Sequence, residues 1–288
     1  MASKKRNEET EVETTGHEWD GIQEWNNPLP RWWLWTLYLC IIWGVGYLIA
    51  YPAIPLLNGA TPGLLGYSTR GEVASEIARF DAANADIEAK LEAADLNTVG
   101  DDAELASFSR NAGEAVYETW CIQCHGAGGG GATGYPALVD NDWLWGGTID
   151  DIYTTVKHGI RTEDDFDARF SQMPAFGEFM SEEEIASLVA HVQTISGQDA
   201  DATLATAGEQ LYYDNCASCH GDEGTGDRFQ GAPDLTDRIW LFGGDTAALT
   251  ETIANARFGV MPSWSARDMP ESDIRAVALY VHQLGGGE

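Results

Sequence analysis

The chain has 288 residues and a formal net charge of −30, because 46 Asp and Glu residues outnumber 16 Lys and Arg residues. So acidic a surface repels nucleic acid, which excludes a nucleic-acid-binding function and favours a basic protein partner. The length allows two small domains with additional elements.

Residues 1–31 are polar and charged and predict an N-terminal tail whose first part is disordered. Residues 32–51 contain no charged side chain, and a helix of that length spans roughly 30 Å, the thickness of bilayer hydrocarbon. Trp and Tyr side chains lie at its two ends, as interfacial anchors do. The pattern predicts a transmembrane helix at 32–51, in preference to a buried core helix or a cleaved signal peptide.

Basic residues are concentrated before this span, and Arg70 is the only one among the twenty residues after it; those before it are Lys4, Lys5, Arg6 and Arg31. The positive-inside rule therefore predicts a cytoplasmic N-terminus, with the rest of the chain on the outer side.

Residues 52–106 are expected to form an extracytoplasmic loop, then a helix, then a polar linker. The helix is predicted at 71–95, because apolar residues recur there at steps of three and four, and the linker at 96–106. The apolar stripe comprises Val73, Ile77, Phe80, Ile87 and Leu91.

A Cys-x-x-Cys-His pentapeptide occurs twice, at 121–125 and at 216–220. This pattern is the attachment site for haem c: two thiols one helical turn apart bond the vinyl groups of the ring, and the adjacent His ligates the iron. A zinc site or a redox dithiol pair would not require the trailing His. The sequence predicts two covalently attached haem c groups, held by Cys121, Cys124 and His125 and by Cys216, Cys219 and His220.

The surroundings of the two pentapeptides repeat as well. Similar segments precede each motif, similar Trp-Leu-aromatic-Gly-Gly segments follow it, and an amphipathic helix closes each copy. We therefore predict two copies of one small helical domain, at 107–197 and 203–286, joined by a polar linker near 198–206.

Each copy also offers a Met followed by Pro at a matched position before the closing helix, Met173 and Met261. A thioether in that place is the typical sixth ligand of a small cytochrome c, and it raises the reduction potential. The alternative is that these Met side chains fill the core. Pairing within one copy is the simpler expectation, but the sequence also allows the two copies to exchange their Met loops. Met180 and Met269 are lower-ranked candidates.

His158 precedes Gly159 at a predicted helix end, where an imidazole helps to cap carbonyl groups. Residues 126–131 are rich in glycine, but no Lys-Ser/Thr follows them, so they predict a loop at the haem edge and not a phosphate site.

The chain resembles the dihaem cytochrome c subunits of cbb3-type cytochrome c oxidases, called CcoP or FixP. The most specific part of the resemblance is the segment from Trp19 to Trp33, which contains Trp-Asp-Gly-Ile-Gln-Glu and Asn-Pro-Leu-Pro-Arg-Trp-Trp and leads directly into the span. Tyr51-Pro52-Ala53-Ile54-Pro55 fits the far end of that span, and the two repeats follow in order.

The resemblance implies an all-α fold, with an N-terminal single transmembrane helix followed by two tandem class I cytochrome c domains. It implies a subunit that is not itself catalytic, in the inner membrane of a bacterium with its haem domains in the periplasm. Electrons would pass from a donor cytochrome c through this subunit to a monohaem cytochrome c subunit and on to the catalytic haem–copper subunit of a proton-pumping respiratory complex. The implied metal ligands are His125, Met173, His220 and Met261.

Two other functions remain open from the residues. One is a free-standing anchored dihaem shuttle, or the cytochrome subunit of a periplasmic dehydrogenase. The other is a haem sensor or peroxidase, which would need an open position on the iron.

Overall fold

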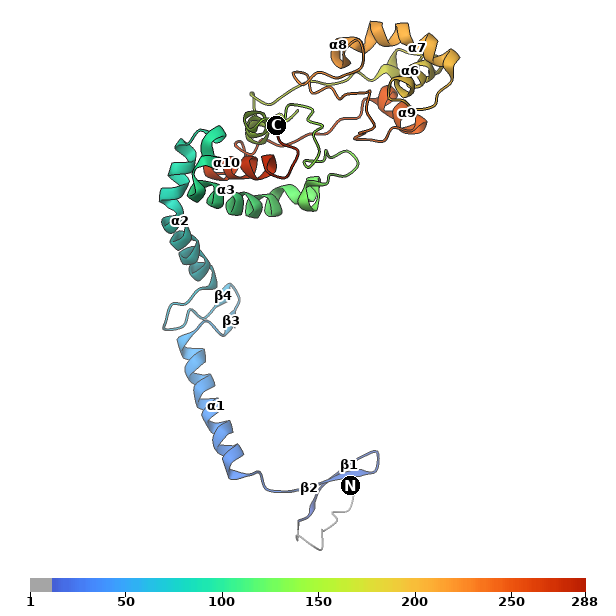
Figure 1. Cartoon of the computed structure of the whole chain (residues 1–288). Coiled ribbons are helices and arrows are strands. Elements are labelled where there is room, and N and C mark those ends of the chain that lie inside the picture. Colours follow the sequence, from blue (N-terminus) through green and yellow to red (C-terminus); the bar gives the residue numbers. More distant parts are fainter. Residues whose placement is uncertain (1–11) are drawn as a thin grey trace. The chain divides into compact units, whose positions relative to one another are not determined.

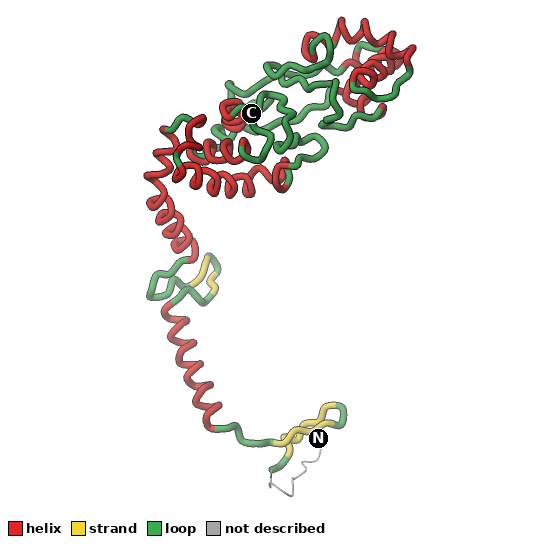
Figure 2. The backbone as a smooth tube through the Cα atoms, viewed as in Figure 1, coloured by secondary structure: helices red, strands yellow, loops and turns green. Residues whose placement is uncertain are grey.

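The computed structural model describes residues 12–288, so the disorder expected at the start of the tail lies outside the described residues. The chain divides into two compact units. The first ends at Ala83, and the second comprises Asn84–Glu288. Figure 2 shows that helices and loops make up most of the chain and that the strands are short.

The described part of the tail contains a hairpin that was not predicted from the sequence. Strand β1 (Thr14–Trp19) pairs antiparallel with β2 (Ile22–Trp25). Asp20 and Gly21 at the turn both have positive φ, 52° and 82°. Asp-Gly is the typical pair for a two-residue hairpin turn, so the signal was present in the sequence.

Helix α1 (Arg31–Ala50) confirms the predicted apolar helix, one residue earlier than expected. It stops at Tyr51 because that residue precedes a proline and is held in the extended region. None of its side chains is buried, and its mean hydropathy is 1.7, so length and composition suit a membrane span. A minimal hairpin of β3 (Pro55–Leu56) and β4 (Gly59–Ala60) follows.

Helix α2 (Thr69–Ala93) confirms the predicted helix. Leu91 of its apolar stripe is fully buried and Ile87 packs against the same core, whereas Val73, Ile77 and Phe80 are more than half exposed.

The prediction of a linker at 96–106 was wrong. Residues Leu96–Asp101 form a 3₁₀ helix, η1, and α3 begins at Ala103. Leu96, Val99 and Leu105 are buried in the core. Only three apolar side chains anchor this segment, too few to stand out among its polar residues.

The second unit is built from short helices joined by long loops. Several of its helices are capped at the N-terminus by the side chain that precedes them. Asp102, Thr148 and Asp201 each accept a hydrogen bond from a backbone N–H in the first turn of the helix that follows. Ser181 and Glu184 form a capping box at the start of α6. The elements of this unit after η1 are α3 (Ala103–Val116), the π-helix η2 (Tyr117–Cys121), α4 (Ile122–His125), η3 (Ala127–Gly129), α5 (Ile149–His158), η4 (Phe176–Glu178), α6 (Glu182–Ile195), α7 (Ala202–Asn215), α8 (Ala217–His220), α9 (Thr246–Asn255) and α10 (Glu271–His282).

The two closing helices are exchanged between the sequence repeats. Helix α10, from the second repeat, packs on α3 of the first, and α6, from the first, packs on α7 of the second (Figure 1). Both crossings are close: a Cβ added to Gly113 would lie 2.3 Å from the carbonyl oxygen of Ala276, and one added to Gly208 would lie 2.1 Å from that of Ser187. Glycine permits these approaches because it has no Cβ.

As a result, each hydrophobic core combines both repeats. The first core joins α3 and α5 with α10 and Trp264, and the second joins Phe176 and α6 with Tyr212 and α9. The predicted boundaries, 107–197 and 203–286, describe the repeat along the chain, and the packing adds that neither repeat closes on itself.

Candidate haem sites

Both pentapeptides lie at the end of a helical segment. Helix α3 continues through η2 into α4, which ends at His125, and α7 is followed by α8, which ends at His220. A glycine follows each His, Gly126 and Gly221, both with a φ of 78°. The left-handed conformation ends the helix there and turns the chain away.

Both histidines have the same hydrogen-bond partner, the carbonyl of a proline. Nδ1 of His125 lies 3.1 Å from the Pro136 oxygen, and Nδ1 of His220 lies 3.0 Å from the Pro233 oxygen. A carbonyl only accepts, so Nδ1 carries the proton and Nε2 keeps its lone pair for a metal. Burial lowers the pKa of both imidazoles, which favours the neutral, ligating form.

Two tyrosines support the ends of the motifs in the same way. The hydroxyl of Tyr117 donates to the Gly126 carbonyl at 2.8 Å, and that of Tyr212 donates to the Gly221 carbonyl at 2.9 Å. Both rings are at least 98% buried. These tyrosines and the proline carbonyls were not predicted from the sequence, although their matched positions in the two repeats were a signal.

The first thiol of each motif lies in apolar surroundings, whereas Cys124 is exposed. Cys121 packs against the first core and Cys216 against the second. Burial raises the pKa of each thiol to about 11. Reactive dithiols need a lowered pKa, so this setting disfavours a redox dithiol pair.

The structure places Met261 beside the first motif. An apolar cavity is lined by Met261 together with Cys121 and His125, although Met261 comes from the other repeat. Two backbone hydrogen bonds hold it there, from Ile160 N–H to the Met261 carbonyl at 2.9 Å and from Met261 N–H to the Ile160 carbonyl at 3.0 Å. Of the two arrangements left open by the sequence, the exchanged one is present at this motif.

Met173 shares the second core with Cys216. The lower-ranked candidates are close by: Met180 contacts the second core and Met269 the first. Met269 does not line the cavity that contains His125.

The residues around the first motif fit a haem. The cavity walls are almost wholly apolar, as a flat porphyrin requires, with a thiol, an imidazole and a thioether among them. Trp145, also in the lining, is 93% buried, and its indole N–H has no hydrogen-bond partner within residues 12–288; the same holds for Nε of Arg169, whose guanidinium stacks near the Trp145 ring. Buried donors of this kind suit the carboxylate groups of a haem.

The two motifs, their half-buried imidazoles and the apolar helix α1 define the class: a membrane-anchored c-type cytochrome with two haem-attachment motifs. Comparison with known proteins agrees. Residues 11–58 match the family described as the N-terminal domain of cytochrome oxidase-cbb3, FixP, and residues 109–192 and 203–281 match the family described as cytochrome c oxidase, cbb3-type, subunit III.

Relatives match over nearly their full length. The chain is 56% identical to the cbb3-type cytochrome c oxidase subunit CcoP of Cereibacter sphaeroides, over 280 residues that cover 96% of each chain. It is 48% identical to the subunit FixP of Azorhizobium caulinodans, covering 96% of this chain and 94% of the relative. The chain therefore belongs to the CcoP/FixP family, the electron-transfer subunits of cbb3-type cytochrome c oxidases.

Proposed function

We propose that this subunit carries two haem c groups with crossed axial ligands. His125 and Met261 ligate the iron at the first motif, and His220 and Met173 ligate the iron at the second. The observation that carries this proposal is the position of Met261 in the cavity of Cys121 and His125. Helix α6 of the first repeat, which follows the Met173 loop, packs on α7 of the second repeat, which precedes His220. This packing supports the pairing of Met173 with His220.

A haem c with both axial positions filled supplies one-electron Fe(III)/Fe(II) chemistry and offers no free position for O₂ or peroxide. The protein's own part is to hold the ring through its thiols, to orient each imidazole through a proline carbonyl, and to exclude water with apolar walls. We therefore assign this subunit electron transfer without catalysis of its own.

The subunit takes electrons from a donor cytochrome c and delivers them to a monohaem cytochrome c subunit, from which they reach the haem–copper subunit that reduces O₂. Family membership supports this route. The acidic surface supports a basic donor, because opposite charges speed encounter. The distribution of Lys and Arg around α1 supports an inner-membrane protein with a cytoplasmic N-terminus and periplasmic haem sites.

Two double variants test the crossed ligands in the full-length protein purified in mild detergent. His125→Ala with Met261→Ala should strip both axial ligands from one haem and leave the other native, so about half of the weak near-infrared Met–Fe(III) band remains. His125→Ala with Met173→Ala should take one ligand from each haem and abolish the band. Haem staining after denaturing electrophoresis checks attachment.

Pairing within each repeat would give the opposite pattern, and that result would reject the crossed assignment. CO binding by the native reduced protein would instead support an open iron site, as in a sensor or peroxidase. Co-purification with the haem–copper subunit, together with oxygen consumption, separates an oxidase subunit from a free-standing shuttle.

A further inference from the structure

The segment that carries Met261 is attached to the end of α5 over several residues. Beyond the two hydrogen bonds between Ile160 and Met261, the N–H of Ser265 donates to the Lys157 carbonyl at 3.1 Å. The hydroxyl of Ser265 lies 2.9 Å from the same carbonyl. Residues 261–265 of the second repeat therefore run along residues 157–160 of the first.

The carboxylate of Asp165 is the centre of this attachment. Its Oδ2 lies 2.8 Å from the hydroxyl of Ser263 and 3.0 Å from Nδ1 of His158, and its Oδ1 accepts the N–H of Asp167 at 2.9 Å. The hydroxyl oxygens of Ser263 and Ser265 both lie near Asp165 Oδ2, at 2.8 and 3.3 Å, and near the Lys157 carbonyl oxygen, at 2.8 and 2.9 Å. Their two protons therefore match these two acceptors, and the shorter contact to Asp165 is that of Ser263.

The hydrogen bonds to Asp165 are shielded from water, which strengthens their hold on the Met261 loop. Ser263 is fully buried, and the Asp165 side chain is 12% exposed. The Asp167 N–H and the Ser263 hydroxyl lower the pKa of Asp165 to about 2, so the acceptor is ionised at neutral pH. Hydrogen bonds to a charged, partly buried acceptor are stronger than those between neutral groups.

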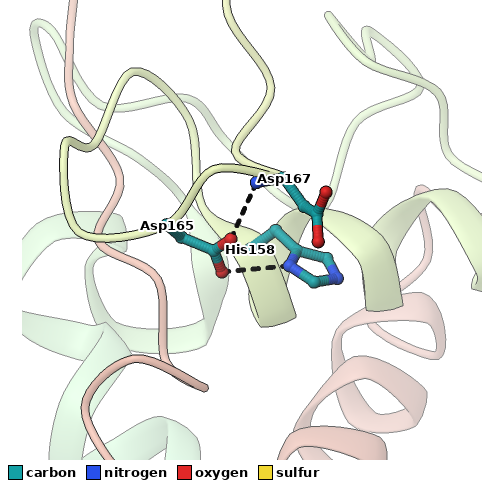
Figure 3. A group of neighbouring side chains, drawn as sticks. All are labelled: His158, Asp165 and Asp167. Atoms are coloured by element: carbon teal, nitrogen blue, oxygen red, sulfur yellow. Dashed lines mark hydrogen bonds and ion pairs between the residues drawn. The ribbon is translucent and has the colours of Figure 1, made fainter.

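Figure 3 shows His158, Asp165 and Asp167 close together, an arrangement that also resembles a cation site. The hydrogen bonds argue against that use. Oδ2 of Asp165 already faces a hydroxyl and an imidazole N–H, and Nδ1 of His158 would have to release its proton to bind a metal. Asp167 is exposed and contributes its backbone N–H.

The other Met loop, which belongs to the first repeat, lacks this arrangement. Ala175 occupies the position after Met173-Pro174 that Ser263 occupies after Met261-Pro262. The first repeat also has a longer connection from its helix to the Met, from Gly159 to Met173, and Asp165 lies within it. The attachment therefore acts on one Met loop, and the other haem site is an internal control.

We propose that Asp165, with Ser263 and His158, is a positioning device for the Met261 thioether and thereby sets the reduction potential of the first haem. The proposal rests on the crossed ligand assignment made above. Only Pro262 separates Ser263 from Met261, so loss of the buried hydrogen bond lets the loop move away from the cavity. A weaker thioether bond lowers the potential, because thioether ligation raises it.

The test uses the full-length haem protein with Asp165→Ala, Asp165→Asn and Ser263→Ala, the last of which installs the side chain found at the matched position of the first repeat, Ala175. Asp167→Asn is the matched control, since its backbone N–H is retained. In a redox titration, Asp165→Ala and Ser263→Ala should move one of the two haem waves to lower potential and leave the other in place. The near-infrared Met–Fe(III) band should lose up to half its intensity. Asp165→Asn keeps an acceptor oxygen and should fall between wild type and Asp165→Ala.

Unchanged waves in both Asp165→Ala and Ser263→Ala would overturn the proposal, and so would an equal shift of both waves. Met261→Ala separates this failure from failure of the ligand assignment. If Met261→Ala opens the first haem while the Asp165 and Ser263 variants behave as wild type, only the positioning role is lost. If Met261→Ala leaves that haem intact, the crossed assignment itself has failed.

Discussion

The crossing of α3 and α10 at Gly113 gives a prediction with two opposing contributions. Ala favours a helix over Gly by about 1 kcal/mol, which would stabilise the variant Gly113→Ala. However, the new Cβ would lie 2.3 Å from the Ala276 carbonyl oxygen and 2.7 Å from Cβ of Tyr280. Neither atom is the flexible end of a side chain, and overpacking of this kind costs about 1–3 kcal/mol.

With contacts this short, the overpacking cost lies at the top of its range, so the net effect is a loss of about 2 kcal/mol. For a unit of roughly 200 residues this corresponds to a fall in Tm of about 4–8 °C. Thermal unfolding of the full-length protein in detergent, followed by circular dichroism, measures it. Gly208→Ala should behave alike, since its Cβ would lie 2.1 Å from the Ser187 oxygen.

Gly100→Ala is the control, because a Cβ at Gly100 meets nothing within 4 Å. If Gly113→Ala melted at or above the wild-type temperature, helix propensity would have won and the close crossing of α3 and α10 would be refuted.

Three further predictions concern single groups. Tyr117→Phe removes one of the two hydrogen bonds to the Gly126 carbonyl, which keeps the N–H of Gly129, and should cost about 0.5–1.5 kcal/mol, measured by denaturant unfolding; an unchanged midpoint would count against the bond. Burial and the nearby charge of Asp237 raise the pKa of Asp142 to about 6. An acid whose folded-state pKa is raised makes the protein less stable as pH rises from about 4 through 6. Asp142→Asn should therefore flatten that part of the curve of unfolding free energy against pH. A curve parallel to that of the wild type would contradict the raised pKa of Asp142. Reduction by a basic donor cytochrome should slow as salt rises, and a rate independent of ionic strength would show that the acidic surface does not steer it.

Local patterns were enough to propose haem attachment, since it depends on residues that are neighbours in the chain. The Cys-x-x-Cys-His spacing is set by one helical turn, and helices α4 and α8 end at His125 and His220 as that spacing requires. The apolar run of α1 was equally plain, because a membrane span is defined by length and composition. The segment at 96–106 was missed, since its few buried side chains become meaningful only against the core they join.

The sequence alone did not predict which helix each closing helix packs on. Helices α6 and α10 carry similar apolar stripes, so each could pack on α3 or on α7 without any change in pattern. Contacts between residues far apart in the sequence determine the packing partner. They include the close crossing at Gly113, the Ile160–Met261 hydrogen bonds and the hydrogen bond between Ser263 and Asp165. The sequence was enough to propose His and Met ligands for two irons, whereas the packing of distant helices brings Met261 into the cavity of His125. Hydrophobic periodicity specifies that a face is buried but not what buries it.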